Sequence, residues 1–233
     1  YAIVPDYYNG IVPKVVAKVG EKVKAGSVLM IDKNRPEIKF VSPVSGEVTA
    51  VNRGEKRKVL SVVVKPEAQI EYEDFGKKNV ASLKREEVKE AILHAGMWPF
   101  IKQRPYDIVA SPADEPRDIF VSAFYSAPLA PNFDFVVKGQ EVDFQTGLDA
   151  LAKLTDGKVY VGIRKGSSVS VKGVETVEVE GPHPAANVGV QINHIKPINK
   201  GEVVWTVNPA DVIVIGRLFN KGIADFSRLV VIR

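Results

Sequence analysis

The sequence contains no cysteine among its 233 residues. This absence excludes disulfides, thiolate metal sites, iron–sulfur clusters and thiol nucleophiles, so an electron crossing this chain would need a non-covalently bound organic carrier. The three histidines, His94, His183 and His194, lie too far apart in sequence for a compact set of metal ligands, and no nucleophile or paired acid accompanies them. We therefore expect no metal site and no catalytic triad, and we interpret the three histidines as structural.

Glycine-rich phosphate loops are also missing, since neither G-x-G-x-x-G nor G-x-x-x-x-G-K-S/T occurs in the sequence. Such loops hold phosphates at helix N-termini, so their absence argues against a dinucleotide site. The basic segment Gly162–Gly166 follows a predicted strand and is interpreted as an ordinary turn. No apolar run approaches the roughly 18 residues that a membrane-spanning helix needs. We expect a soluble chain that attaches to membranes only through other proteins.

Charge is distributed unevenly along the sequence. Residues 1–60 carry 11 basic and 6 acidic side chains, whereas the remaining residues sum to a net charge of minus one. A basic surplus on a small module suits an anionic membrane surface or an acidic partner, but without interleaved aromatic residues it is a poor sign of nucleic-acid binding. We therefore expect no nucleic-acid partner.

Residues 1–70 are rich in valine and glycine, with short alternating segments that predict a compact β module. The pattern V-G-x-x-V-x-x-G-x-x-L, followed by S-P-V-S-G-x-V, is typical of a biotinyl/lipoyl-like barrel-sandwich hybrid. In a carrier domain of this type a modified lysine lies at the tip of the hairpin between the two halves. Here Lys33 lies two residues too far from Ser42-Pro43, and Pro36 reshapes the turn. We interpret Lys33 as a solvated surface lysine.

Residues 71–173 alternate between helix and strand, which predicts a mainly parallel, Rossmann-like α/β domain. One helix is expected to begin at Ser82 and to end at Gly96, and a second to run from Asp143 to Gly157. The predicted strands are Asp107–Ala110, Ile119–Phe124 and Lys158–Ile163.

Residues 174–233 are expected to form a small α+β C-terminal part. Its predicted elements are the strand Val174–Val179, a helix from Asn208-Pro209 to about Asn220, and the strand Ser227–Ile232. The sequence opens without an initiator methionine and stops inside this last strand, so both ends are expected to be cuts in a longer chain.

The proline-punctuated segment from Gly96 to Tyr106 contains the most informative cluster outside the β module. Met97, Trp98 and Phe100 offer two alternatives, a core plug between domains or an apolar patch that faces a partner or a flat ring ligand. In the second case Arg104 can donate to a ring carbonyl and His183, fixed between two prolines, is a candidate neighbour. We therefore name these five residues as candidates for a site that faces a partner or a flat ring ligand.

Several colinear segments together resemble the family of A subunits of the sodium-translocating NADH:quinone reductase. The segments are Asp32–Gly46, Val51–Arg57, Gly96-Met97-Trp98, Arg104-Pro105, Ile119–Ala123, Pro128-Leu129-Ala130, Gly147-Leu148, Gly157–Val161 and Gly181–Ala185. The resemblance runs nearly end to end, and its Asn-Arg-Gly-Glu and Gly-Pro-His-Pro pieces are specific to the family.

The resemblance implies a peripheral subunit on the cytoplasmic side of a bacterial inner-membrane complex that couples NADH oxidation and ubiquinone reduction to sodium export. Its implied partners are the other subunits, especially the membrane subunit, with ubiquinone as a further candidate. The resemblance thus makes a quinone the expected ring ligand of the five candidates Met97, Trp98, Phe100, Arg104 and His183. The family is similar to the C subunit of the ferredoxin-dependent ion pump and, more remotely, to the flavin- and NADH-binding subunit of complex I. Where those relatives keep a glycine-rich loop, this sequence has His94–Pro99 with one glycine and the bulky Trp98.

We expect this chain to carry no redox cofactor, while the complex uses NADH, flavins, iron–sulfur clusters and ubiquinone in other subunits. The alternative is a stand-alone flavin- or nucleotide-binding oxidoreductase domain, and the missing phosphate loop argues against it. A lipoyl-type carrier module is a third hypothesis, which the position of Lys33 disfavours.

Overall fold

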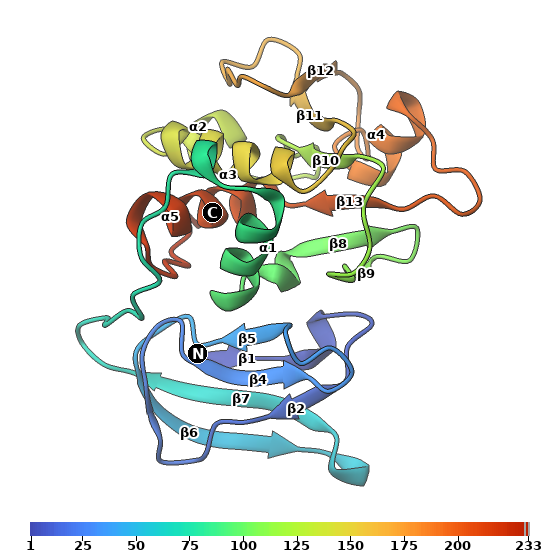
Figure 1. Cartoon of the computed structure of the whole chain (residues 1–233). Helices are drawn as coiled ribbons and strands as arrows, with labels where there is room; N and C mark the ends of the chain where they lie inside the picture. Colours follow the sequence, from blue (N-terminus) through green and yellow to red (C-terminus); the bar gives the residue numbers. More distant parts are fainter. Residues whose placement is uncertain (231, 233) are drawn as a thin grey trace.

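The computed structural model describes residues 1–230 and 232, which fold into a β module and a larger α/β body stacked on it (Figure 1). The module's strands are β1 (Ala2–Ile3), β2 (Pro13–Val15), β3 (Lys22–Val23), β4 (Val28–Asp32), β5 (Lys39–Val41), β6 (Gly46–Arg53) and β7 (Val59–Pro66). They form two sheets, in the orders β1-β7-β6-β3 and β2-β4-β5, with every neighbouring pair antiparallel.

The module encloses its own small core of valines with Leu29, as the alternating pattern of the sequence predicts. Gly46 is held at a φ of +156°, and a Cβ there would collide with the backbone carbonyl of Lys65 on the paired strand β7. This close approach explains the glycine of the S-P-V-S-G motif. Lys33 is exposed in the turn after β4, where the sequence analysis expected a solvated lysine.

The α/β body is built on one mixed sheet in the order β12-β11-β10-β13-β8-β9. Its strands are β8 (Ile101–Arg104), β9 (Ile108–Val109), β10 (Ile119–Ser122), β11 (Val159–Arg164), β12 (Glu175–Val179) and β13 (Val204–Val207). The pairs from β12 to β13 are parallel, whereas β8 and β9 are antiparallel to their neighbours. The predicted mainly parallel sheet is therefore confirmed.

Helices cover both faces of this sheet. They are α1 (Arg85–His94), α2 (Phe133–Val137), α3 (Glu141–Lys153), α4 (Val188–Ile195) and α5 (Pro209–Lys221). On one face α1, α3 and α5 pack over Val121 and Trp205 in the main core. On the other face α4 packs over Phe120 and Val204 in a smaller cluster. The sheet is therefore buried on both sides, as expected when helices connect parallel strands.

The helix ends follow local capping chemistry. The side chain of Asn208 accepts a hydrogen bond from the N–H of Ala210 at 3.0 Å, which starts α5, and Gly222 at φ +74° ends it. The expected start of α1 at Ser82 was wrong, because Ser82 belongs to a separate 3₁₀ turn, Val80–Ser82. Instead the backbone N–H of Lys84 donates to Glu87 at 2.8 Å, so the N-cap is Lys84, two residues after Ser82, and α1 begins at Arg85.

The predicted final strand Ser227–Ile232 was also wrong over the described residues, which show no strand pairing there; Val231 lies outside them. Side-chain contacts replace the ladder, because Arg228 pairs with Asp211 and Phe226 packs edge-on against Phe100. The proposed boundaries at residues 70 and 173 stay predictions. We note that the sheet takes β11 from one side of residue 173 and β12 and β13 from the other.

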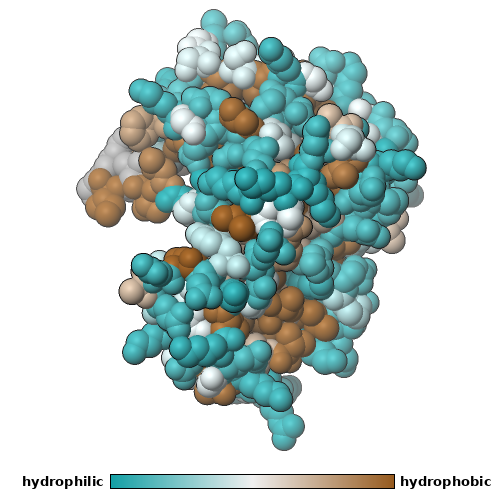
Figure 2. All heavy atoms as spheres, turned by 60° about the vertical axis from the view of Figure 1, so that its left-hand side comes forward, coloured by the Kyte–Doolittle hydropathy of each residue, from teal (hydrophilic) through white to brown (hydrophobic). Residues whose placement is uncertain are grey.

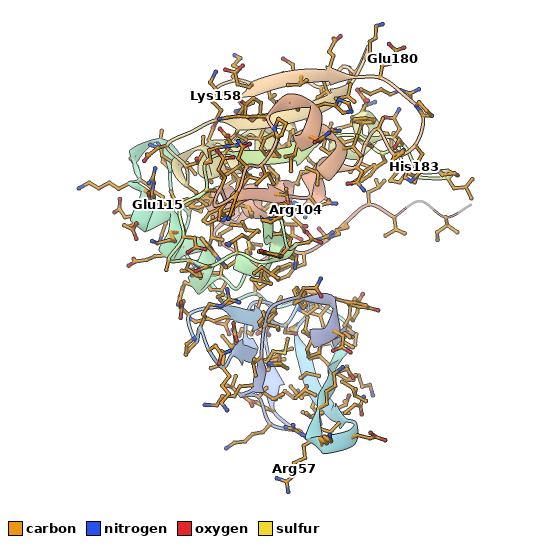
Figure 3. The ribbon with its side chains drawn as sticks, turned by 90° about the vertical axis from the view of Figure 1, so that its right-hand side faces the viewer. Arg57, Arg104, Glu115, Lys158, Glu180 and His183 are labelled. Carbon is orange, nitrogen blue, oxygen red and sulfur yellow. The ribbon has the colours of Figure 1, made fainter. Side chains whose placement is uncertain are left out.

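Much of the molecular surface is hydrophilic, with apolar side chains gathered in separate patches on the face shown in Figure 2. Figure 3 marks the two extremes of the molecule, with Arg57 at the tip of the hairpin between β6 and β7 and Glu180 beyond the sheet of the α/β body.

Helices α3 and α5 cross at close range because each presents a glycine to the other's backbone. A Cβ on Gly216 would collide with the carbonyl oxygen of Asp143, and one on Gly147 would collide with that of Val212. Backbone groups cannot move aside as a flexible side chain can, so this crossing tolerates no larger residue without a shift of one helix.

We predict that Gly216→Ala lowers the free energy of unfolding by about 2 kcal/mol, because the overpacking cost exceeds the helix propensity gained. Urea unfolding followed by circular dichroism measures the change. Gly189→Ala in α4 is the matched control, since a Cβ there meets only Asn187 Oδ1 at 3.4 Å. The control should be neutral or stabilising by up to about 1 kcal/mol; an equal loss in both variants would contradict the steric explanation.

Candidate functional site

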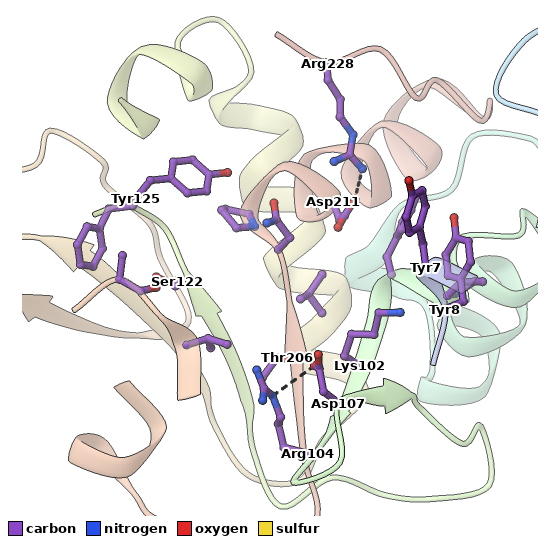
Figure 4. Close-up of a pocket in the computed structure, with 18 residues that line it drawn as sticks. Tyr7, Tyr8, Lys102, Arg104, Asp107, Ser122, Tyr125, Thr206, Asp211 and Arg228 are labelled. Carbon is purple, nitrogen blue, oxygen red and sulfur yellow. Dashed lines mark hydrogen bonds and ion pairs between the residues drawn. The ribbon is translucent and has the colours of Figure 1, made fainter. Parts of the chain in front are cut away.

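A cleft of about 450 Å³ lies at the carboxyl ends of β10 and β13 (Figure 4). The strand order reverses between these two parallel strands, because the chain runs outward from β10 to β11 and β12 and then returns over the α4 face to β13 on the other side of β10. Ligands of doubly wound sheets bind at such a switch point. The side chains that line the cleft are Tyr7, Tyr8, Pro99, Phe100, Lys102, Arg104, Asp107, Ser122, Phe124, Tyr125, Ala186, Val188, Thr206, Val207, Asn208, Pro209, Asp211 and Arg228.

The β module supplies part of this wall. Tyr8 packs edge-on against Phe40 of β5, with ring centroids 4.8 Å apart, and its ring lies 5.1 Å from the ammonium nitrogen of Lys102. Tyr7, by contrast, is 79% exposed at the rim. The cleft is therefore assembled from both bodies, and its shape depends on how they are fixed to each other.

Charged side chains enter the cleft from β8, from the loop after it, from α5 and from the C-terminal segment. Arg104 Nε lies 3.5 Å from Asp107 Oδ1, and Arg228 pairs with Asp211 in the first turn of α5. Lys102 and Arg104 occupy alternate positions of β8, so both project to the same face of the sheet. Lys102 forms no ion pair or hydrogen bond with the residues that the structure describes, apart from its contact with the Tyr8 ring.

Burial shifts the titration of these groups. Burial raises the pKa of the Asp211 carboxyl, although Arg228 and Lys102 oppose this effect. Burial lowers the pKa of Lys102 and raises that of Tyr8, so both favour their uncharged forms more than in water. A cleft that shifts several neighbouring groups through desolvation is a candidate ligand site on physical grounds.

The five candidate residues that the sequence indicated fall into two groups in the structure. Met97 and Trp98 are completely buried, and Trp98 Nε1 donates to the carbonyl of Ala110 at 2.8 Å while its ring packs edge-on against Trp205 at 5.4 Å. These two side chains therefore form a core plug and offer no surface to a ligand, contrary to our quinone-facing hypothesis for them.

The other three candidates do reach hollows of the surface. Phe100 and Arg104 both line the cleft. His183 lies in an adjoining hollow of about 660 Å³, which shares Phe124 and Tyr125 with the cleft. There His183 Nδ1 is 3.2 Å from the hydroxyl of Ser126, and this pair is exposed. The described residues bring no third group to complete a triad, and they contain no cluster of three potential metal ligands.

The single glycine of the His94–Pro99 segment has a packing role. Gly96 ends α1 at φ +67°, and a Cβ there would overlap the side chain of Val41 in the β module. Contact between the two bodies is thus enough to require a glycine at this position.

Sequence reasoning missed Tyr8, Lys102, Asp211 and Arg228. Their only local signal was the alternation of Lys102 and Arg104 on a short strand, which places both on one face. Tyr8 and Arg228 are more than 200 residues apart in sequence, and periodicity does not reveal that both line one cleft.

Two family models match the chain in the order of its two bodies. The "NqrA N-terminal barrel-sandwich hybrid domain" matches residues 1–67, and the "NqrA second alpha/beta domain" matches residues 83–224, more than half of the chain. The chain belongs to the NqrA family. This membership confirms the resemblance inferred from the sequence, and the two descriptions agree with the predicted fold class.

Curated relatives carry the same family name. The A subunits of the Na(+)-translocating NADH-quinone reductase from Neisseria meningitidis serogroup A and Hahella chejuensis are each 38% identical to this chain over 234 residues, and that from Yersinia pestis is 36% identical. Each alignment covers 98% of this chain and 52% of the relative. The chain therefore spans about half the length of these NqrA relatives. Among the described residues, no helix has both the length and the apolar character that crossing a bilayer requires.

We predict that Trp98→Ala lowers the free energy of unfolding by about 3–5 kcal/mol, as expected for a buried aromatic side chain. The substitution also leaves the Ala110 carbonyl without its buried donor. Tyr106→Ala is the control from the same segment, because this side chain is 78% exposed, and it should change stability by less than about 0.5 kcal/mol. Urea denaturation of both variants measures the difference, and a mild effect of Trp98→Ala would rule out the core plug.

Proposed function

We propose that this chain is part of the A subunit of a sodium-translocating NADH-quinone reductase, and that it holds a quinone ring in the cleft without a redox cofactor of its own. The observation that carries the proposal is the aromatic cleft at the switch point, in a chain whose NqrA relatives are named as subunits of a quinone reductase.

The chemistry of the cleft suits a quinone. The side chains of Phe100, Phe124 and Tyr125 give flat apolar surfaces for a ring, and stacking on one of them contributes about 1 kcal/mol beyond area burial. Lys102 and Arg104 carry N–H donors, and a quinone offers two carbonyl acceptors and no donor. Arg104 Nε is buried and lacks a hydrogen bond within the described part of the chain. A ring carbonyl in the cleft can accept the hydrogen bond that this donor lacks.

The other components of the reductase are the proposed partners of this chain, and its membrane subunit is the foremost of them. We place the chain at the cytoplasmic side of the bacterial inner membrane as a peripheral component. Family membership supports this assignment, and the redox cofactors of the complex are assigned to other subunits. Co-purification of the chain with a tagged membrane subunit tests the assembly, and loss of the chain on mild detergent washing would contradict it.

A stand-alone flavin- or nucleotide-binding domain is the alternative from another class. The site offers no glycine-rich turn for phosphates, because Gly96 is enclosed against Val41. A near-stoichiometric flavin absorbance band that survives gel filtration would favour this alternative over the quinone proposal.

We predict that Phe100→Ala weakens binding of short-chain ubiquinone about fivefold, the equivalent of about 1 kcal/mol of aromatic contact. Isothermal titration calorimetry on the chain measures the dissociation constant. Phe135→Ala is the matched control, because Phe135 lies on α2 outside the cleft and is 61% exposed. Equal binding by all three proteins, or no binding by any, would contradict a quinone site here.

A further inference from the structure

Lys102 is the one charged side chain lining the cleft that has no ion partner among the described residues. The other four form two pairs, Arg104 with Asp107 and Arg228 with Asp211. The amine of Lys102 faces these two carboxylates and the Tyr8 ring, yet it forms a hydrogen bond with none of them in the described structure. The cleft therefore carries one uncompensated positive charge.

A buried charge at the amino end of β10, on the opposite side of the same sheet from the cleft, is fully paired. The fully buried Asp118 carboxylate is 2.7 Å from both Arg117 Nε and Lys196 Nζ, and it accepts the N–H of Lys158 at 3.1 Å. Removing charges from water is costly unless partners replace the lost hydration, and Asp118 has these partners. Lys102 is half-buried in the cleft and has no such partners among the described residues. This contrast suggests that the missing partner of Lys102 is a ligand.

We propose that Lys102 makes the cleft selective for the anionic form of a planar ring ligand, with its ammonium group donating to a ring oxygen that bears negative charge. The ligand class comprises hydroxyquinones and quinols that have lost a proton. The inference rests on the proposed function, because it specifies which charge state of the ring the quinone cleft prefers.

The position of Lys102 supports a role in charge selection. Thr206 of β13 lies opposite Lys102 in the sheet register, and both residues line the cleft. The Lys102 side chain therefore belongs to the floor of the cleft rather than to its rim. The aromatic walls contact a neutral and an anionic ring to about the same extent, so they contribute little to discrimination. A charge-assisted hydrogen bond is roughly twice as strong as a neutral one, and desolvation in the cleft strengthens it further.

Two ligands that share one ring system test the inference. The first is 2-hydroxy-1,4-naphthoquinone, which is an anion at neutral pH, and the second is its uncharged methyl ether. We expect the 233-residue chain to bind the anion about tenfold more tightly, the equivalent of about 1.4 kcal/mol. Calorimetric titration of both ligands at constant ionic strength gives this ratio without any variant.

The variant Lys102→Met keeps the length of the side chain and removes its charge, so the preference for the anion over the methyl ether should disappear. Lys158→Met is the matched control, because Lys158 is an exposed lysine at the opposite edge of the sheet, and it should keep the tenfold preference. Circular dichroism confirms that both variants are folded.

The possible outcomes separate this inference from the proposed function. Equal binding of the anion and the ether to the unsubstituted chain would overturn the charge selection and leave the quinone cleft standing. If the preference for the anion persists in Lys102→Met, another cation produces it, and the inference is also overturned. Failure of both ligands to bind would overturn the quinone cleft itself, and the inference with it.

Discussion

The guanidinium of Arg35 fixes the seam, that is, the interface between the β module and the α/β body. The shape of the cleft depends on this interface. Arg35 is anchored by the buried carboxylate of Asp32 at 2.9 Å, and from there it donates to the carbonyls of Gly10 in the module and Val109 in the α/β body. Buried charges that are fully hydrogen-bonded set geometry more effectively than they add net stability. Because Tyr8 comes from the module and Lys102 from the sheet, a rotation at the seam would separate two walls of the cleft.

The seam is also continuous with the hydrophobic core. Met30, Ile38 and Phe40 of the module belong to the same buried cluster as Trp98 and the helices of the α/β body. Gly96 packs directly against Val41 of the module, and the Met97 and Trp98 side chains that follow it are completely buried in this cluster. Fold and site are thus linked through one packed interface, since the segment that buries Trp98 continues into Phe100 and Lys102, which face the cleft.

Local patterns in the sequence predicted the elements whose signals are themselves local. The valine–glycine pattern gave the module, and the Asn208 cap and Gly222 placed α5 correctly. The prediction of a final strand from Ser227 was wrong, because the alternation of its residues resembles a strand although side-chain contacts with Asp211 and Phe100 hold this segment. The prediction of the site residues failed in part for the same reason. The apolar cluster around Trp98 marked the right region, but only tertiary packing decides which of its side chains face inward.

The backbone around Gly96 in the His94–Pro99 segment is not arranged to bind phosphate. A phosphate-binding loop needs exposed backbone N–H groups, whereas here the backbone around Gly96 is packed against Val41 and followed by two buried side chains. The cleft at the switch point of the sheet is walled by aromatic rings, two ion pairs and Lys102, which has no ion partner in the described part of the chain. Such a surface offers flat aromatic faces and one positive charge, which supports the proposed quinone ligand over a nucleotide carrying several phosphate charges.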